Sequence, residues 1–316
     1  MRSAFFAALT TLAERDDRIH LIVGDLGFGV VETFARRFPD RFLNAGVAEQ
    51  NMTGVAVGMA LSGKIVFTYS IANFPVLRCL EQIRNDVCYH NANVKVVAVG
   101  GGLAYGSLGA SHHATEDLAV MRSLPGMVVV APGDPIETDL ATAAVAAHSG
   151  PCYLRLGRAG EAKVHQAGIN FELGKAVEVR DGEDLTIVST GGMLQTAVQV
   201  SDRLQVQGLN ARVLSMHTLQ PLDHAALSSA LRDTGAIFTL EEHSIIGGLG
   251  GAVAEFVAES CQAPFTFKRF GLPPTFSCVS GSQEFLREKN NLTAEPLAAL
   301  IRSALQKERQ LTTQQV

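Results

Sequence analysis

The sequence predicts an α/β protein with two consecutive doubly wound, mainly parallel sheets. Short apolar runs of strand length alternate with longer segments that have helical spacing, and this alternation is typical of parallel strands joined by crossover helices. It stops at residues 157–174, a polar stretch that contains glycine, and then begins again. We therefore expect two domains, residues 1–165 and 166–316, with the boundary inside this stretch.

The elements follow one another in a regular order. Strands are expected at 21–23, 42–44, 65–69, 94–99, 127–131 and 153–156, and then at 185–189, 211–215, 237–240 and 265–270. After an amphipathic segment at the N-terminus, helices are expected at 30–38, 50–61, 76–89, 115–122 and 135–148, and then at 194–207, 225–231 and 252–260. Open α/β sheets bind ligands at the carboxyl ends of their strands, so the loops that follow the strands hold the candidate site residues.

Composition restricts the class of protein. A chain of 316 residues with 47% hydrophobic content can bury a full core, and its apolar runs are far shorter than the roughly 20 residues that cross a bilayer. A net charge of −5 without a basic cluster argues against nucleic acid as a partner. No signal peptide is recognised, and no CxxC pair is present, which favours a reducing, cytoplasmic location. The five cysteines are Cys79, Cys88, Cys152, Cys261 and Cys278.

A carboxylate stands between a short strand and a long apolar helix in Asn44-Ala-Gly-Val-Ala-Glu-Gln-Asn51. If Glu49 is buried there without a positive partner, desolvation raises its pKa and lets it exchange protons near neutrality. The alternative is a glutamate that makes only a favourable contact with the helix dipole. The motifs further along the chain favour the first interpretation, a catalytic carboxylate.

Two neighbouring loops offer further candidates. The glycine-rich segment 24–29 follows the first strand, and a tight turn is favoured there over a phosphate cradle because the known phosphate-binding spacings are missing. Asp25 is placed to point into a site from that turn. Phe74 stands at the strand-to-helix corner before Pro75, which suits a first helical turn. Its ring either belongs to the core or stacks on a planar heterocycle.

The longest irregular segment, residues 100–117, is rich in glycine and follows the fourth strand. Loops of this length cost conformational entropy, which favours a binding role. His112 and His113 precede two acidic residues, but the spacing is not that of a familiar metal site, so we expect no metal ligand here. Thr115 and the two acids are typical of a helix start. His112 is then free to donate or accept protons in a cleft.

Arginine supplies the candidate anion contact. Arg158 lies in Arg-Leu-Gly-Arg after the sixth strand, where it is suited to holding an anionic group, although an arginine that only faces solvent is the alternative. Arg78, His113 and Ser107 are the other predicted substrate contacts.

Five motifs together resemble the C-terminal half of a transketolase, over residues 1 to about 305. They are Asn44-Ala-Gly-Val-Ala-Glu-Gln-Asn-Met52, Glu81-Gln-Ile-Arg-Asn-Asp86, Gly109-Ala-Ser-His-His-Ala-Thr-Glu-Asp117, Met121-Arg-Ser-Leu-Pro125 and Glu241-Glu-His-Ser-Ile-Ile-Gly-Gly-Leu-Gly250. The resemblance implies a thiamine diphosphate enzyme with a pyrimidine-binding domain followed by a transketolase C-terminal domain.

The resemblance also implies roles for individual residues. Glu49 matches the glutamate that hydrogen-bonds the aminopyrimidine ring of the cofactor and promotes its imino tautomer, and Phe74 falls where the family places an aromatic ring against that pyrimidine. His112 matches the histidine that assists proton transfers at the reacting carbon. Arg158 lies near the arginine for the anionic end of the substrate. Asp25 is a looser match, to a cofactor contact.

One departure from the family predicts a partner. Full-length transketolases carry Gly-Asp-Gly and a downstream Asn that hold a divalent metal and the cofactor diphosphate, and this sequence has no Gly-Asp-Gly. We therefore expect a separate N-terminal subunit to hold the diphosphate and Mg²⁺, in an α2β2 heterotetramer with the active site shared between subunits.

A second departure concerns the substrate. Ser107 and Leu108 stand where many transketolases have an acidic residue, and Gly100 stands where a phosphate-binding histidine is common. We expect an unusual ketose, phosphorylated or sulfonated, as donor of a two-carbon ketol unit to an aldose. The alternatives are a β subunit of a 2-oxo acid dehydrogenase, a relative of deoxyxylulose phosphate synthase, or a structural subunit without catalysis.

Overall fold

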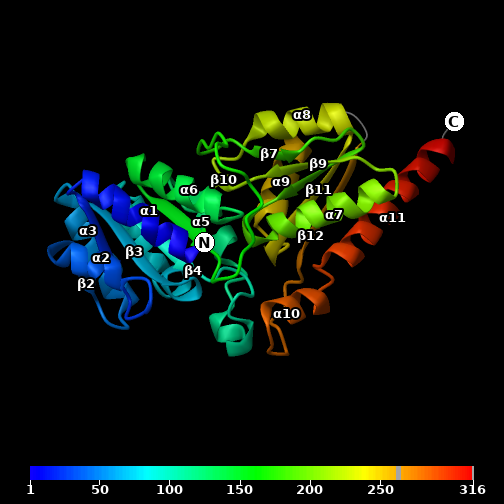
Figure 1. The fold of residues 1–316 in the computed structure, drawn as a ribbon. Helices are drawn as coiled ribbons and strands as arrows, with labels where there is room; N and C mark the ends of the chain where they lie inside the picture. The colour runs from blue at the N-terminus through cyan, green and yellow to red at the C-terminus, as the bar shows by residue number, and fades with distance from the viewer. Residues whose placement is uncertain (261–264, 315–316) are drawn as a thin grey trace.

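The computed structural model describes residues 1–260 and 265–314 and contains two mainly parallel sheets flanked by helices (Figure 1). The N-terminal lobe, residues 1–156, and the C-terminal lobe, residues 177–314, lie side by side, and the first part of the last helix packs against the C-terminal lobe. The predicted fold class is confirmed. The placement of the domain boundary at residue 165 stays a prediction; residues 157–176 run between the lobes without helix or strand.

The first sheet has the strand order β10-β5-β6-β4-β3-β1-β2. All neighbours pair in parallel except β10, which runs antiparallel to β5. Its strands are β1 (Ile19–Val23), β2 (Phe42–Asn44), β3 (Ile65–Ile71), β4 (Val94–Val99), β5 (Val128–Val130), β6 (Cys152–Leu156) and β10 (Thr218–Gln220).

The second sheet has the order β12-β11-β8-β9-β7, and only β7 is antiparallel to its neighbour. Its strands are β7 (Val177–Arg180), β8 (Leu185–Ser189), β9 (Ala211–Ser215), β11 (Ala236–Ser244) and β12 (Thr266–Leu272). The β1, β3, β4 and β8 strands are buried on both faces, which explains why each reads as an apolar run rather than an alternating one.

The helices cover both faces of each sheet. In the N-terminal lobe they are α1 (Arg2–Arg15), α2 (Glu32–Arg37), η1 (Pro39–Arg41), α3 (Glu49–Leu61), η2 (Phe74–Arg78), α4 (Leu80–Gln82), η3 (Ile83–Cys88), η4 (Gly106–Leu108), η5 (Ala110–His112), α5 (Asp117–Arg122) and α6 (Pro135–Ala147). In the C-terminal lobe they are η6 (Gly191–Met193), α7 (Leu194–Val206), α8 (His224–Thr234), α9 (Leu249–Ser260), α10 (Gln283–Lys289) and α11 (Ala294–Gln314). Among these described helices, none is both long and apolar enough to cross a membrane.

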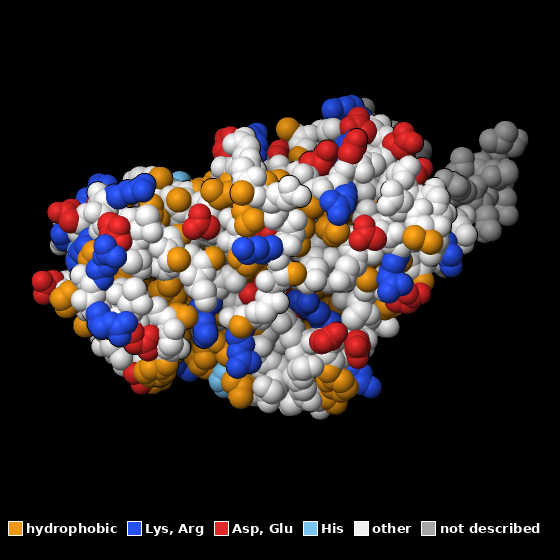
Figure 2. Space-filling view, viewed as in Figure 1, with side chains coloured by type: hydrophobic (Ala, Val, Ile, Leu, Met, Phe, Trp, Pro, Cys, Tyr) orange, Lys and Arg blue, Asp and Glu red, His pale blue; other side chains and the backbone are white. Residues whose placement is uncertain are grey.

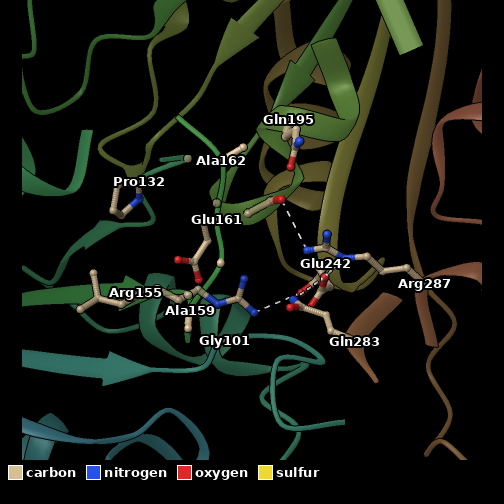
Figure 3. A pocket seen from close by; sticks show the side chains of 16 residues that line it. Gly101, Pro132, Arg155, Ala159, Glu161, Ala162, Gln195, Glu242, Gln283 and Arg287 are labelled. Carbon is tan, nitrogen blue, oxygen red and sulfur yellow. Dashed lines mark hydrogen bonds and ion pairs between the residues drawn. The ribbon is translucent and has the colours of Figure 1, made fainter. Parts of the chain in front are cut away.

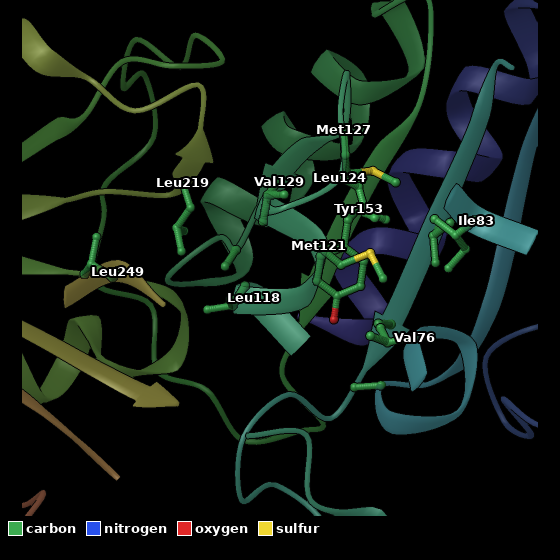
Figure 4. Packing of buried hydrophobic residues seen from close by; sticks show 14 of the residues in the cluster. Val76, Ile83, Leu118, Met121, Leu124, Met127, Val129, Tyr153, Leu219 and Leu249 are labelled. Carbon is green, nitrogen blue, oxygen red and sulfur yellow. The ribbon is translucent and has the colours of Figure 1, made fainter. Parts of the chain in front are cut away.

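The two lobes share a core. Leu219 and Leu249 of the C-terminal lobe belong to the same cluster of buried side chains as Met121 and Tyr153 of the N-terminal lobe (Figure 4). Strand β10 extends this connection, because it leaves its own lobe and pairs with β5 of the first sheet. Burial of apolar surface across the boundary is expected to hold the lobes in one arrangement.

Two details differ from the sequence-based prediction, whereas the cysteines agree with it. The helix expected at 76–89 is divided, because η2 and η3 are π-helical turns on either side of the short α4. Strands β7 and β10 and helices α10 and α11 were not predicted. Cys79, Cys88, Cys152 and Cys278 are free thiols, whereas Cys261 lies outside the described residues.

Candidate active site

The candidate site lies where the strand order of the first sheet reverses. The chain passes from β1 outward to β2 and then returns past β1 to β3, and such a reversal leaves a crevice at the carboxyl ends of the two strands. Gly24 directly follows β1 in this crevice. A Cβ atom at this position would lie 3.4 Å from Ser70 Oγ and 3.5 Å from Glu49 Cγ. The backbone of the first loop therefore packs closely beside Glu49.

Glu49 is the first residue of α3, and its side chain is only 1% exposed. Ser70 Oγ donates a hydrogen bond to Glu49 Oε1 at 3.2 Å, and Arg78 Nη1 donates to Glu49 Oε2 at 2.7 Å. The predicted burial of the carboxylate is confirmed. The condition that it lacks a positive partner is wrong, because the π-helical turn η2 brings Arg78 back toward it. The catalytic role of Glu49 stays a prediction.

Two aromatic rings stand beside this ion pair. Phe74 begins η2, and its ring meets the His112 ring edge-on, with 5.2 Å between the ring centroids. The Arg78 guanidinium carbon lies 4.6 Å from the centroid of the Phe74 ring. The structure therefore brings together Glu49, Phe74, His112 and Arg78 from three separate loops. Arg78, predicted to bind substrate, contacts Glu49 and Phe74 here.

The His112 loop is held in place by contacts that the sequence did not indicate. Asn73 Nδ2 donates to the backbone oxygen of Ser111 at 2.6 Å, and Ser111 Oγ lies 3.0 Å from His112 Nδ1. Tyr105 packs on Gly100, where a Cβ atom would stand 2.1 Å from the tyrosine ring. Gly100 also has a left-handed backbone with φ 82°. Glycine is thus required at this position, both for its conformation and for the close approach of Tyr105.

The other predicted site residues lie around the rim. Arg158 is exposed, and its guanidinium carbon lies 4.9 Å from the centroid of the Tyr105 ring, which is 6.5 Å from the His112 ring. Asp25 is exposed and accepts a hydrogen bond from Asn44 Nδ2 at 2.9 Å, which joins the ends of β1 and β2. Ser107 is exposed on η4.

The His113 side chain lies apart from the crevice that holds His112. It is buried, and its Nε2 lies 3.5 Å from the backbone oxygen of Gly106 in its own loop. It lines a separate hollow between this loop and residues 272–279.

The left-handed backbone of Asp25 (φ 55°) and Gly27 (φ 94°) confirms the tight turn that was favoured for residues 24–29.

A polar hollow between the lobes is distinct from the Glu49 crevice (Figure 3). Its charged side chains are already paired. Arg287 Nε donates to Glu242, and Glu242 Oε1 also accepts from the Leu103 backbone N–H at 2.6 Å. Arg155 on the opposite wall binds Asp117. This hollow therefore joins the lobes through satisfied ion pairs rather than offering an uncompensated charge to a ligand.

Comparison with known proteins places this geometry in a family. Residues 1–160 match the transketolase pyrimidine binding domain, and residues 174–296 match the transketolase C-terminal domain. The chain belongs to the transketolase family. The crevice that holds Glu49 and Phe74 thus lies in the pyrimidine binding domain of a transketolase.

Several relatives match along almost their entire length. The chain is 38% identical over 298 residues to the 6-deoxy-6-sulfo-D-fructose transketolase subunit SqwH of Clostridium sp. (strain MSTE9), covering 94% of this chain and 92% of that protein. It is 40% identical over 274 residues to an apulose-4-phosphate transketolase subunit of Phocaeicola vulgatus, covering 86% and 87%. Among solved structures, a split gene transketolase described as an inactive β4 tetramer superposes with a TM-score of 0.87 at 40% identity, covering 96% and 97%.

Proposed function

We propose that this chain is the C-terminal subunit of a split transketolase that uses thiamine diphosphate. It transfers a two-carbon ketol unit from a ketose to an aldose, and its active site is completed by a separate N-terminal subunit. The meeting of Glu49, Phe74 and His112 in one crevice carries this proposal. Full-length matches to proteins named as transketolase subunits support it over the 2-oxo acid dehydrogenase and deoxyxylulose phosphate synthase alternatives.

The residues of the crevice suit the pyrimidine end of the cofactor. A planar group with N–H donors fits between the Glu49 carboxylate and the Phe74 ring, because the guanidinium of Arg78 makes both contacts in this structure. An aminopyrimidine ring is also planar and bears an amino group. When bound, thiamine diphosphate supplies the electron sink for carbanion chemistry.

Each protein group then has a separate task. With the cofactor bound, Glu49 would hold a proton at a ring nitrogen of the pyrimidine, and Phe74 would provide an aromatic face for the same ring. His112 moves protons to and from substrate oxygens, with Nδ1 oriented by the Ser111 hydroxyl at 3.0 Å. Arg158, placed at the rim beside Tyr105, binds the anionic end of the substrate. Asp25, Ser107 and His113 remain candidates for further contacts with cofactor or substrate.

The rim of the crevice suits a protein partner. Large apolar side chains are exposed on the loops after β1 and β2, where Phe28 is 73% and Val47 is 72% exposed, and Leu77 and Leu108 are exposed on the next two loops. Figure 2 shows hydrophobic side chains gathered along the lower edge of the molecule. Exposed apolar groups of this kind mark protein interfaces. We propose that the N-terminal subunit, carrying the diphosphate and Mg²⁺, docks here in an α2β2 heterotetramer.

The substrate is proposed to be an unusual phosphorylated or sulfonated ketose of carbohydrate metabolism. The chain has Gly100 at the close contact with Tyr105, and Leu108 is exposed on η4, so neither position offers a polar side chain to a sugar. Relatives named for a sulfonated and for a phosphorylated sugar support this choice. A cytoplasmic site of action would keep the four described free thiols reduced.

Reconstitution tests the proposal. The chain is mixed with a candidate N-terminal transketolase subunit, thiamine diphosphate and Mg²⁺, and two-carbon transfer is followed with a panel of ketoses. We expect activity only in the mixture, with a sulfonated or unusual phosphorylated ketose as the best donor. Xylulose 5-phosphate as the best donor would contradict the substrate proposal, and oxidative decarboxylation of a 2-oxo acid would contradict the transketolase assignment.

A further inference from the structure

Arg78 makes both of the contacts that the pyrimidine ring of the cofactor would make. Its Nη1 donates to Glu49 Oε2 at 2.7 Å, and its guanidinium carbon lies 4.6 Å from the centroid of the Phe74 ring. The other carboxylate oxygen of Glu49 already accepts from Ser70 Oγ at 3.2 Å. Both oxygens of the buried carboxylate, and one face of the aromatic ring, are therefore occupied by side chains of the chain itself.

A guanidinium resembles an aminopyrimidine in the properties that matter here. It is flat, it presents N–H donors in its plane, and it stacks on aromatic faces. We propose that Arg78 is a placeholder in the cofactor-free subunit. It occupies the position beside Glu49 and Phe74 where the pyrimidine ring would bind, here called the pyrimidine seat, and it must leave this position when the cofactor binds. This inference rests on the proposed function, since it takes Glu49 and Phe74 as the pyrimidine contacts.

The position of Arg78 makes such a movement feasible. The side chain is 45% exposed, whereas Glu49 is 1% exposed, so Arg78 can swing toward solvent while the carboxylate stays fixed by Ser70. An empty seat would leave a buried carboxylate without a cation, which is costly. The placeholder thus stabilises the free subunit. It also lowers the apparent affinity for cofactor to the intrinsic affinity multiplied by the fraction of molecules in which the seat is open. Once displaced, Arg78 becomes available to an anionic substrate group.

Arg78→Ala tests the placeholder by opening the seat. Thiamine diphosphate with Mg²⁺ is titrated calorimetrically into the reconstituted complex, and thiamine, which has the pyrimidine ring without the diphosphate, is titrated into this chain alone. Both ligands are expected to bind Arg78→Ala at least about tenfold more tightly than wild type, which corresponds to a seat closed in about nine of ten wild-type molecules. The matched control is Arg37→Ala, which removes the same charge from an exposed pair with Glu14 on the other side of the lobe.

Equal or weaker binding by Arg78→Ala in the thiamine arm would overturn the proposal, as would no binding of thiamine to either chain at millimolar concentration. If the thiamine arm succeeds while thiamine diphosphate fails to bind the mixture, the proposed partnership fails and the placeholder stands. Because Arg78→Ala risks misfolding around an unpaired Glu49, the wild-type chain provides a second measurement. The guanidinium NMR signal of Arg78, assigned by its loss in Arg78→Lys, is expected to shift on saturation with thiamine, and an unchanged signal would overturn the proposal.

Discussion

Asp117 and Arg155 form a buried ion pair, with Arg155 Nε 2.7 Å from Asp117 Oδ2. The hydroxyl of Tyr153 donates to the same carboxylate oxygen at 2.6 Å, and Arg155 Nη2 donates to the backbone oxygens of Ala114 and Glu242. One guanidinium therefore fixes three segments of the chain, including the end of the loop that carries His112. Burial, with Asp117 nearby, raises the pKa of Tyr153 well above its ordinary value, so this hydroxyl stays a donor.

Removing one partner of this pair is expected to destabilise the chain strongly. Asp117→Ala leaves the Arg155 charge buried and uncompensated, a change that typically costs about 3–5 kcal/mol in the free energy of unfolding. Urea unfolding of the isolated chain measures it. Glu295→Ala is the control, since it breaks an exposed pair with Arg203 and should cost under about 1 kcal/mol. Similar losses for the two variants would mean that the buried pair does not hold the fold.

Glu49→Gln is expected to lower turnover of the reconstituted complex by about 10²-fold or more, because the amide keeps the shape of the side chain and loses its proton exchange. Steady-state kinetics at saturating cofactor measure the effect. Glu14→Gln, at an exposed position of α1, should leave turnover unchanged. If Glu49→Gln kept turnover within about tenfold of wild type, the acid–base role of Glu49 would be wrong.

His112→Gln is expected to reduce turnover by about 10²- to 10⁴-fold while cofactor affinity changes little, since His112 touches Phe74 only at its edge and acts on the substrate. Turnover and calorimetric cofactor binding are measured on the same preparation. His90→Gln, an exposed histidine of the same lobe, serves as control. A large loss of cofactor affinity in His112→Gln would assign His112 to cofactor binding instead.

The pair of His165 and Glu137 predicts a pH dependence of stability. His165 Nε2 lies 2.8 Å from Glu137 Oε1, and both side chains are buried. Burial alone would lower the pKa of His165, but the hydrogen bond and charge of Glu137, with the charge of Asp134, outweigh it and raise that pKa above its ordinary value. Burial lowers the pKa of the nearby His217. The charge on His165 therefore stabilises the fold below the unfolded pKa, and this contribution is lost as pH rises through the folded pKa.

His165→Gln keeps a neutral donor to Glu137 and removes only the charge. The loss of unfolding free energy relative to wild type should be larger at about pH 6 than at about pH 9, because the charge on wild-type His165 is lost as pH rises through its folded pKa. Urea unfolding at both pH values measures this difference, and His90→Gln should show little change between them. A loss that stayed constant or grew with pH would contradict the sign derived for His165.

Much of the fold could be predicted because its strands are buried and apolar. Strands such as β4 and β8 are buried at every position, so their runs of valine, isoleucine and leucine stand out in the sequence. Strand β10 was missed because it is three residues long and gains its place by pairing with β5, far away in the chain. The division of the helix at 76–89 was missed because π-helical turns have no strong local sequence signal.

The sequence predicted which loops hold the site residues, but it did not predict several contacts between those residues. Glu49, Phe74 and His112 follow strands of one parallel sheet, and that topology brings them to one edge. The ion pair between Glu49 and Arg78 was not foreseen, because sequence spacing does not show that η2 bends Arg78 back to α3. Tyr105 was also missed, although the glycine at position 100, which makes room for its ring, was the signal that could have indicated it.

The active site is proposed to be shared between two different subunits. Calorimetric titration of thiamine diphosphate with Mg²⁺ into this chain alone, and then into its mixture with the N-terminal subunit, tests it most directly. We predict tight binding only in the mixture. Tight binding of thiamine diphosphate by the chain alone would contradict the account, because a diphosphate site would then exist within these residues.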